Sequence, residues 1–70
     1  MNIKKGKYQH YKGNVYEVLG VARHSETLEY MVLYQALYGD FGIWVRPFKM
    51  FIEEIEVNGE IKKRFECIES

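Results

Sequence analysis

The sequence is made of short runs in which apolar and polar residues alternate, and each run is closed by residues that favour turns. Val15–Arg23 is the clearest of these runs, and Lys12, Gly13 and Asn14 precede it. A period of two places successive side chains on opposite faces of a β-strand. Repeated at short intervals in a chain of 70 residues, the pattern predicts one small all-β domain.

Turn signals divide the first part of the chain into four strands. Gly20 marks a bulge or a point of close approach within the second strand. Pro47 ends the fourth strand, because it lacks a backbone donor, and it suits the first position of a helical turn, which we expect at residues 47–50. The four predicted strands are residues 7–11, Val15–Arg23, residues 30–37 and residues 43–46.

The last third of the chain fits either a helical spacing or a hairpin, and charge pairing favours the hairpin. Asn58 and Gly59 form a type I′ two-residue turn in this interpretation. Opposite charges then face each other across the two strands, which a helix would not require. The pairs expected from this register are Val57 with Glu60, Glu54 with Lys63, and Glu53 with Arg64.

Five or six short strands with one helical turn near Pro47 predict a small SH3-like barrel. The OB-fold is the alternative, but it usually needs more residues and a longer helix. We expect a single domain over residues 1–70, with an ordered core over about residues 6–66.

Composition narrows the classes of function. Ten Lys and Arg balance ten Asp and Glu, which excludes a strongly basic nucleic-acid coat. Seven basic and four acidic residues fall in residues 1–50, against three and six in residues 51–70. Apolar residues make up 47% of the chain and aromatic residues 16%, unlike a disordered protein.

Hydropathy and cysteine content predict a cytoplasmic protein. No apolar stretch follows the basic residues 1–7, so we expect no secretory signal. The longest apolar stretch, around residues 31–34, is far shorter than a membrane span, so we expect no membrane partner. A lone cysteine, Cys67, is typical of a reducing compartment.

Two polar segments are candidates for one ligand groove. A loop after the second strand gathers an imidazole, a carboxylate and hydroxyls, although these side chains also suit the local bonds that shape a turn. Farther along, an indole and a guanidinium share one strand face, which points outward if Ile43 and Val45 point inward. A Trp that only covers a barrel end is the alternative. The candidate residues are Arg23, His24, Glu26, Thr27, Trp44 and Arg46.

These residues predict a non-enzymatic binding module for a peptide or small polar ligand, present as a monomer or weak homodimer. A nucleic-acid contact is the alternative, with Lys5, Lys7, Tyr8, Tyr11 and Lys12 as its residues. A third hypothesis is a small enzyme that uses His24 and Glu26 as acid and base, but the sequence offers no residue that we can name as its nucleophile. We expect no cofactor and no metal, because His10, His24 and Cys67 lack ligand spacing.

Several blocks of the sequence resemble the small bacterial and phage domain-of-unknown-function family numbered 1653. The similarity covers roughly residues 6–65 and is most specific in the block over residues 16–27. It implies a bacterial cytoplasmic setting and a compact β fold similar to SH3-like barrels, which disfavours the OB-fold. It implies no activity, ligand or catalytic residue. The blocks are residues 8–14, residues 16–27, Trp44 to Pro47, and Met50 with Phe51.

Overall fold

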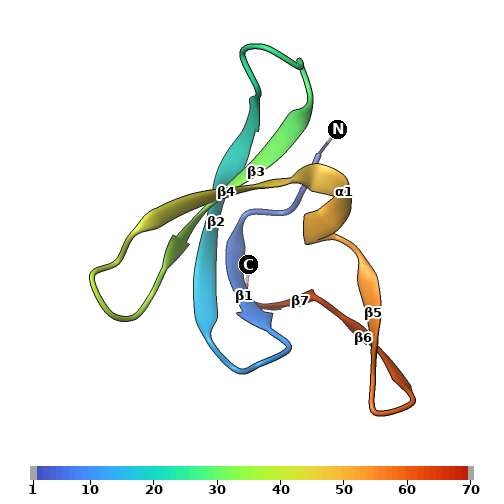
Figure 1. Cartoon of the computed structure of the whole chain (residues 1–70). Coiled ribbons are helices and arrows are strands. Elements are labelled where there is room, and N and C mark those ends of the chain that lie inside the picture. The colour runs from blue at the N-terminus through green and yellow to red at the C-terminus, as the bar shows by residue number, and fades with distance from the viewer. Residues whose placement is uncertain (1, 70) are drawn as a thin grey trace.

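The structure of the chain is a computed structural model that describes residues 2–69. Within these residues the chain forms seven strands and one short helix. The elements are β1 (Gly6–His10), β2 (Val15–Arg23), β3 (Tyr30–Ala36), β4 (Ile43–Pro47), α1 (Phe48–Phe51), β5 (Glu54–Val57), β6 (Glu60–Lys63) and β7 (Phe65–Glu69) (Figure 1).

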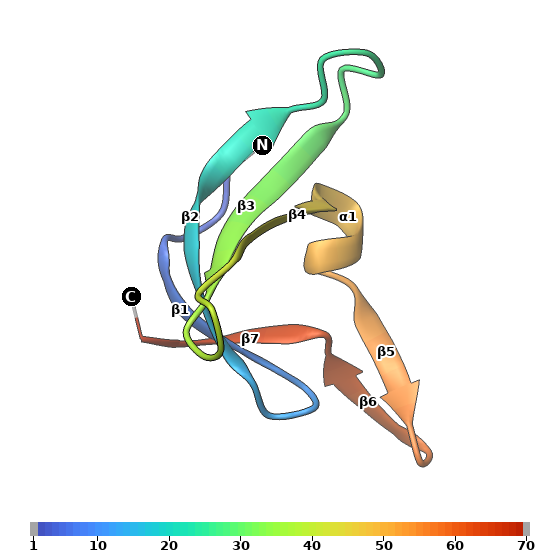
Figure 2. The ribbon, with the colours of Figure 1, turned by 60° about the vertical axis from the view of Figure 1, so that its left-hand side comes forward.

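Five strands form one curled antiparallel sheet in the order β4-β3-β2-β1-β7, and β5 pairs only with β6. Strands β1 to β4 follow one another as a meander, whereas β7 returns to pair with β1. Helix α1 lies on the concave side of the sheet (Figure 2). The prediction of an all-β domain is confirmed. The sheet itself stays open, with β4 and β7 as its two edges.

Seven strands occur where the sequence predicts five or six. The additional strand is β7, because the chain leaves the hairpin after Arg64 and pairs with β1. Nothing in the local pattern of Phe65–Glu69 distinguishes it from a continued hairpin. Its partner is nearly sixty residues away in the sequence, so only the tertiary fold creates this strand.

The C-terminal hairpin has the predicted register. Glu54 pairs with Lys63 and Val57 with Glu60 across the turn. The turn residue Asn58 has φ 52°, within the left-handed region that a type I′ turn requires. The expected ion pair just beyond the ladder, between Glu53 and Arg64, also forms.

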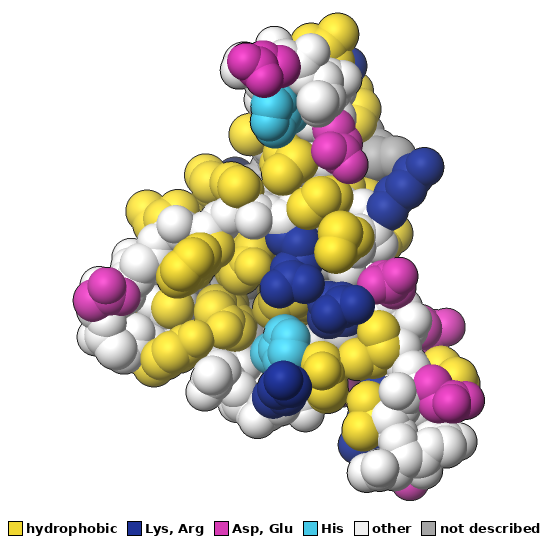
Figure 3. Space-filling model, viewed as in Figure 1, with side chains coloured by type: hydrophobic (Ala, Val, Ile, Leu, Met, Phe, Trp, Pro, Cys, Tyr) yellow, Lys and Arg dark blue, Asp and Glu magenta, His cyan; other side chains and the backbone are white. Residues whose placement is uncertain are grey.

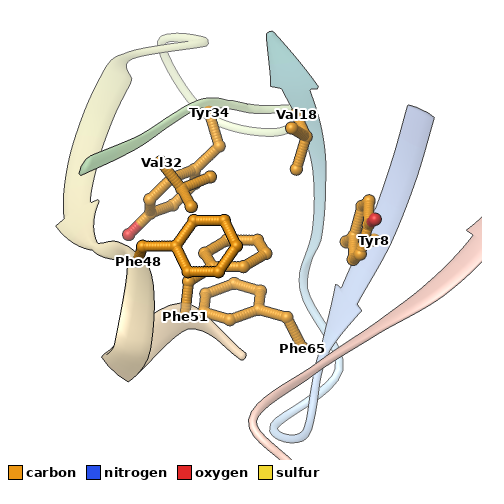
Figure 4. Close-up of a cluster of buried hydrophobic side chains, with 7 residues drawn as sticks. All are labelled: Tyr8, Val18, Val32, Tyr34, Phe48, Phe51 and Phe65. Atoms are coloured by element: carbon orange, nitrogen blue, oxygen red, sulfur yellow. The ribbon is translucent and has the colours of Figure 1, made fainter. Parts of the chain in front are cut away.

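The core lies on the concave side of the sheet and consists mainly of aromatic rings. Phe51 of α1 stacks on Phe65 of β7, with ring centroids 4.1 Å apart and planes inclined by 7°. Tyr34 of β3 lies 5.5 Å from Phe65, and Tyr8 of β1 lies edge-on to Phe51 at 5.6 Å (Figure 4). Fully burying such a ring contributes about 1.5–3 kcal/mol, so large rings supply the area that a small domain needs. The buried cluster is Tyr8, Val18, Val32, Tyr34, Phe48, Phe51 and Phe65.

A bulge in β2 exchanges its two faces. The register with β3 shifts between Val18 and Gly20, as the glycine predicts. Val18 is buried before the bulge, and beyond it Val21 packs against the core while Ala22 is exposed. Strict alternation would have given Ala22 the inner position, because one extra residue moves every later side chain to the opposite face.

Helix α1 is one turn long and begins directly after Pro47, one residue later than predicted. Phe48 and Phe51 lie three positions apart, hence on one face, and both are buried. No helix within residues 2–69 is long and apolar enough to cross a membrane.

We expect Phe51→Ala to lower the free energy of unfolding by about 3–5 kcal/mol, because it removes a ring that is 1% exposed. A core of this size supplies a similar total, so circular dichroism should show a largely unfolded variant. Ile61→Ala is the control, since that side chain is 65% exposed on β6 and its loss should change stability by at most about 0.5 kcal/mol. Equal denaturation midpoints for the two variants would contradict this account of the core.

Candidate functional site

The polar loop between β2 and β3 is closed by hydrogen bonds among its own residues. The Nδ1 atom of His24 accepts the backbone N–H groups of Glu26 at 3.1 Å and Thr27 at 3.3 Å. The Thr27 hydroxyl accepts the backbone N–H of Glu29 at 3.2 Å. These bonds shape the turn, which is the structural alternative that the sequence offers for this loop.

Strand β4 turns its side chains the opposite way from the sequence prediction. Trp44 pairs with the core residue Tyr34, and directly opposed residues of antiparallel strands share one face. Trp44 and Arg46 therefore lie on the concave side, and Ile43 and Val45 face the convex side. The condition under which the sequence placed Trp44 and Arg46 outward, with Ile43 and Val45 pointing inward, is not met, because the pairing with β3, rather than the apolar character of β4, decides the faces.

The two halves of the predicted groove lie apart. Arg23 pairs with Tyr30 at one end of the β2–β3 ladder, where its guanidinium lies 4.7 Å from the Tyr30 ring. The His24 loop extends beyond this end, whereas Trp44 lies near the β3–β4 turn at the other end (Figure 1). The described fold thus does not join the His24 loop and Trp44 in one groove.

A different cluster forms on the concave side around Phe65. The Arg46 guanidinium carbon lies 5.5 Å from the Phe65 ring centroid, and its Nε donates to the Tyr34 hydroxyl at 3.4 Å. The His10 ring lies edge-on to Phe65 at 4.9 Å and beside Tyr11 at 4.5 Å. Figure 3 shows Lys, Arg and His side chains in the middle of a face bordered by hydrophobic side chains. The basic concave cluster is defined as His10, Tyr11, Lys12, Tyr34, Trp44, Arg46, Arg64 and Phe65.

Arg64 links this cluster to the C-terminal hairpin. Its Nη2 lies 2.7 Å from a carboxylate oxygen of Glu53, and its side chain is only 21% exposed. Its Nε is buried and has no hydrogen-bond partner. The Arg64 carbonyl accepts the backbone N–H of Tyr11 at 3.0 Å, which ties the β1–β2 turn to the start of β7. On that turn, the Lys12 ammonium lies 5.8 Å from the Tyr11 ring.

His10 lies among three cations. Burial lowers its pKa below the ordinary value of 6.5, and Arg46, Arg64 and Lys12 lower the pKa further. The His10 Nδ1 accepts the backbone N–H of Lys12 at 3.2 Å, so the Nε2 atom carries the proton of the neutral ring. At neutral pH the cluster thus presents three positive charges and an uncharged imidazole.

Aromatic side chains continue from the cluster toward the β3–β4 turn. The hydroxyls of Tyr16 and Tyr38 lie 2.7 Å apart, and the Tyr16 ring lies 5.7 Å from Phe65. Burial, followed by the bond to Tyr38, raises the pKa of Tyr16 to about 12. Tyr38 is 43% exposed and Trp44 is 58% exposed, so both have exposed ring surface.

The residues of the predicted nucleic-acid contact are also divided. Tyr8 is only 7% exposed and its hydroxyl donates to the Lys4 carbonyl at 2.6 Å, so the prediction that it offers a stacking surface is wrong. Side chains alternate between the two faces of β1, and Tyr8 lies on the inward face, so its ring is buried in the core. Lys7 faces the convex side and forms an ion pair with Glu69 at 3.3 Å. Lys5 is exposed, outside the cluster.

Tyr11 and Lys12 join Trp44 and Arg46 in the basic concave cluster. The cluster therefore combines residues from two separate sequence hypotheses. Sequence reasoning missed Arg64 as a site residue, although the predicted hairpin register already placed it where the chain leaves the hairpin. The feature that the sequence did not predict was the return of β7 to β1.

His10 and Tyr11 also line an open cleft of about 570 Å³ between the β1–β2 turn and the β5–β6 hairpin. Lys62 and Lys63 belong to its other wall. The cleft extends the cluster toward β6. Within residues 2–69, no three His, Cys, Asp or Glu residues are grouped so that they could hold a metal ion.

Comparisons with known proteins agree with the resemblance seen in the sequence. The model of a family described as "Protein of unknown function (DUF1653)" matches residues 6–67. A crystal structure of a DUF1653 protein from Bordetella bronchiseptica is similar, with 34% sequence identity and a TM-score of 0.87. The similarity covers 94% of this chain and 87% of that chain. No curated protein matched the sequence.

We expect the stability of the domain to decrease as pH falls below about 6.5, because the unfolded chain then binds a proton that folded His10 resists. The decrease should continue until the pH reaches the lowered pKa of the folded state. His10→Gln should reduce this slope, measured as the difference in urea denaturation between the two proteins from about pH 7.5 to about pH 5. Parallel curves for the two proteins would contradict the lowered pKa.

Proposed function

Because this chain belongs to the DUF1653 family, whose description assigns no activity, we propose its function from its own concave face. The chain is a non-enzymatic binding module that holds an anionic ligand against Arg46, Arg64 and Lys12. The observation that carries the proposal is that Arg46 and His10 both lie against the Phe65 ring, at 5.5 and 4.9 Å from its centroid, with Arg64 adjacent to Phe65 and Lys12 bonded through its backbone to His10.

The electrostatics of the free cluster support an anionic ligand. Like charges gathered around one partly buried ring repel one another, and each disfavours a proton on His10. Glu53 offsets part of the charge at Arg64, from the hairpin side. An anion placed between Arg46 and Lys12 would offset the remaining positive charge. The electrostatics of this face therefore favour a bound anion over water.

The packing of the cations also supports binding. Arg46 is held by the Phe65 ring and the Tyr34 hydroxyl, and Arg64 is largely buried. Side chains fixed before binding lose little conformational freedom when the ligand arrives. A guanidinium has several donors in a plane, which suits a carboxylate or phosphate group.

The other candidate functions have less support. The groove predicted for a peptide or small polar ligand would need Trp44 and the His24 loop together, and these lie at opposite ends of the β2–β3–β4 ribbon. A hydrolase or transferase would need a free base at His24, whose Nδ1 already accepts two backbone N–H groups.

We also infer that the curled sheet is an opened SH3-like barrel. A meander of four strands, a single helical turn and a last strand that returns to β1 support this class. The exposed free thiol of Cys67 supports the predicted cytoplasmic location, where thiols stay reduced.

We expect inorganic phosphate to raise the pKa of His10, because a nearby anion stabilises the imidazolium and offsets the three cations. The measurement is the pH titration of the His10 ring resonances by NMR, without and with phosphate. Arg46→Gln should remove most of the response. Arg23→Gln is the matched control, because Arg23 also lies over an aromatic ring but at the far end of β2. No effect of phosphate on His10, or equal losses in the two variants, would contradict the proposal.

A further inference from the structure

We infer that the anionic ligand of the basic concave cluster is single-stranded nucleic acid, with phosphates beside the cations and a base stacked on Trp44. This inference rests on the proposed function and adds the class of ligand. Single strands are bound by grooves that combine positive charge with aromatic faces. The two parts of the inference, phosphate contact and base stacking, depend on different residues.

Trp44 is the observation that points to a base. It lies on the concave side, two residues from Arg46 on the same strand face, and 58% of it is exposed. The indole borders Gly42, where an added Cβ would lie 3.4 Å from its Nε1. Carboxylates alone would engage the cations but would leave this ring without a partner. A nucleobase has a flat aromatic face that can stack on the indole.

The cluster is elongated and forms a path with a cation at each end. From Arg46 the path leads across the Phe65 ring, which lies 5.5 Å from the guanidinium, to His10 at 4.9 Å from that ring. It continues to Tyr11 at 4.5 Å and ends at Lys12, 5.8 Å from the Tyr11 ring. Two cations held apart at the ends of a row of rings fit successive phosphates of a chain better than one isolated anion.

The distribution of charge limits how far a bound polyanion can extend along the molecule. The C-terminal third has six acidic residues against three basic ones, and three of the acidic residues are in the β5–β6 hairpin. The acidic side chains visible at the lower right of Figure 3 lie beyond the blue and cyan side chains at its centre. In the cleft beside the hairpin, Glu54 and Glu66 balance Lys62 and Lys63, so the excess of positive charge is confined to the concave face. This confinement explains how a chain of zero net charge offers a local site.

Two phosphate contacts, at Arg46 and Lys12, set the size of the salt effect, because the Arg64 guanidinium is paired with Glu53. For single strands the logarithm of affinity falls with the logarithm of salt concentration with a slope of about −0.7 per contact. Two contacts give a slope of about −1.4, so affinity should fall about 7-fold between 50 and 200 mM salt.

Trp44 makes the test direct, because it is the single tryptophan of the sequence. We expect single-stranded thymidine and uridine oligonucleotides of about twelve nucleotides to quench its fluorescence, and the two arms distinguish DNA from RNA. A glutamate peptide of equal charge and a duplex of the same length are the competing ligands. Affinities of variants are measured by the anisotropy of a labelled oligonucleotide, and circular dichroism checks that each variant is folded.

Trp44→Ala should weaken binding about 5- to 150-fold, the effect of losing one stacked base, and Trp44→Phe should restore most of it. Val45→Ala, on the opposite face of the same strand and 54% exposed, should leave binding unchanged. Arg46→Gln should weaken binding and make the salt slope shallower by about 0.7.

The outcomes separate this inference from the proposed function. Equal affinity for the glutamate peptide or the duplex, or full affinity in Trp44→Ala, would overturn nucleic acid as the ligand. Loss of binding in Arg46→Gln would then still leave an anion site. No binding to any of these polyanions, together with no phosphate response of His10, would overturn both.

Discussion

The stack of Phe51 on Phe65 is the contact on which the rest of the molecule depends. It joins the helical turn after β4 to the first residue of β7, at a centroid distance of 4.1 Å. Phe65 can occupy this position only if β7 returns to β1, where it pairs with His10. The same ring supports Arg46 and borders His10. One apolar contact therefore fixes the core, the edge of the sheet and the spacing of the cations.

Local signals predicted the parts of the fold that depend on neighbouring residues. The bounds of Val15–Arg23, the bulge at Gly20 and the hairpin register around Asn58 all follow from short patterns with definite geometry. The return of β7 and the open sheet could not be predicted in this way. They arise from pairings between distant segments, and the sequence of Phe65–Glu69 is compatible with more than one partner.

The candidate site was predicted in pieces for the same reason. Trp44, Arg46, Tyr11 and Lys12 stood out because of their chemistry, but alternation alone could not decide which face of the sheet Trp44 and Arg46 occupy. The face of an edge strand whose residues are nearly all large is decided by its register with the neighbouring strand. No local sequence signal marked Arg64 as a functional residue, because its predicted ion pair with Glu53 was a sufficient structural explanation for it.

The cluster is poorly explained by a structural role alone. A domain of this size has only a few kcal/mol of net stability, and like charges around His10 reduce it. The buried Nε of Arg64 adds an unsatisfied donor, which also opposes folding. Neutral side chains of similar length would cover Phe65 as well as Arg46 does, without the repulsion. The Phe65 ring, the Tyr34 hydroxyl and Glu53 hold the two guanidiniums but leave the repulsion around His10, and an anion beside the cluster would reduce that repulsion, in line with the proposed function.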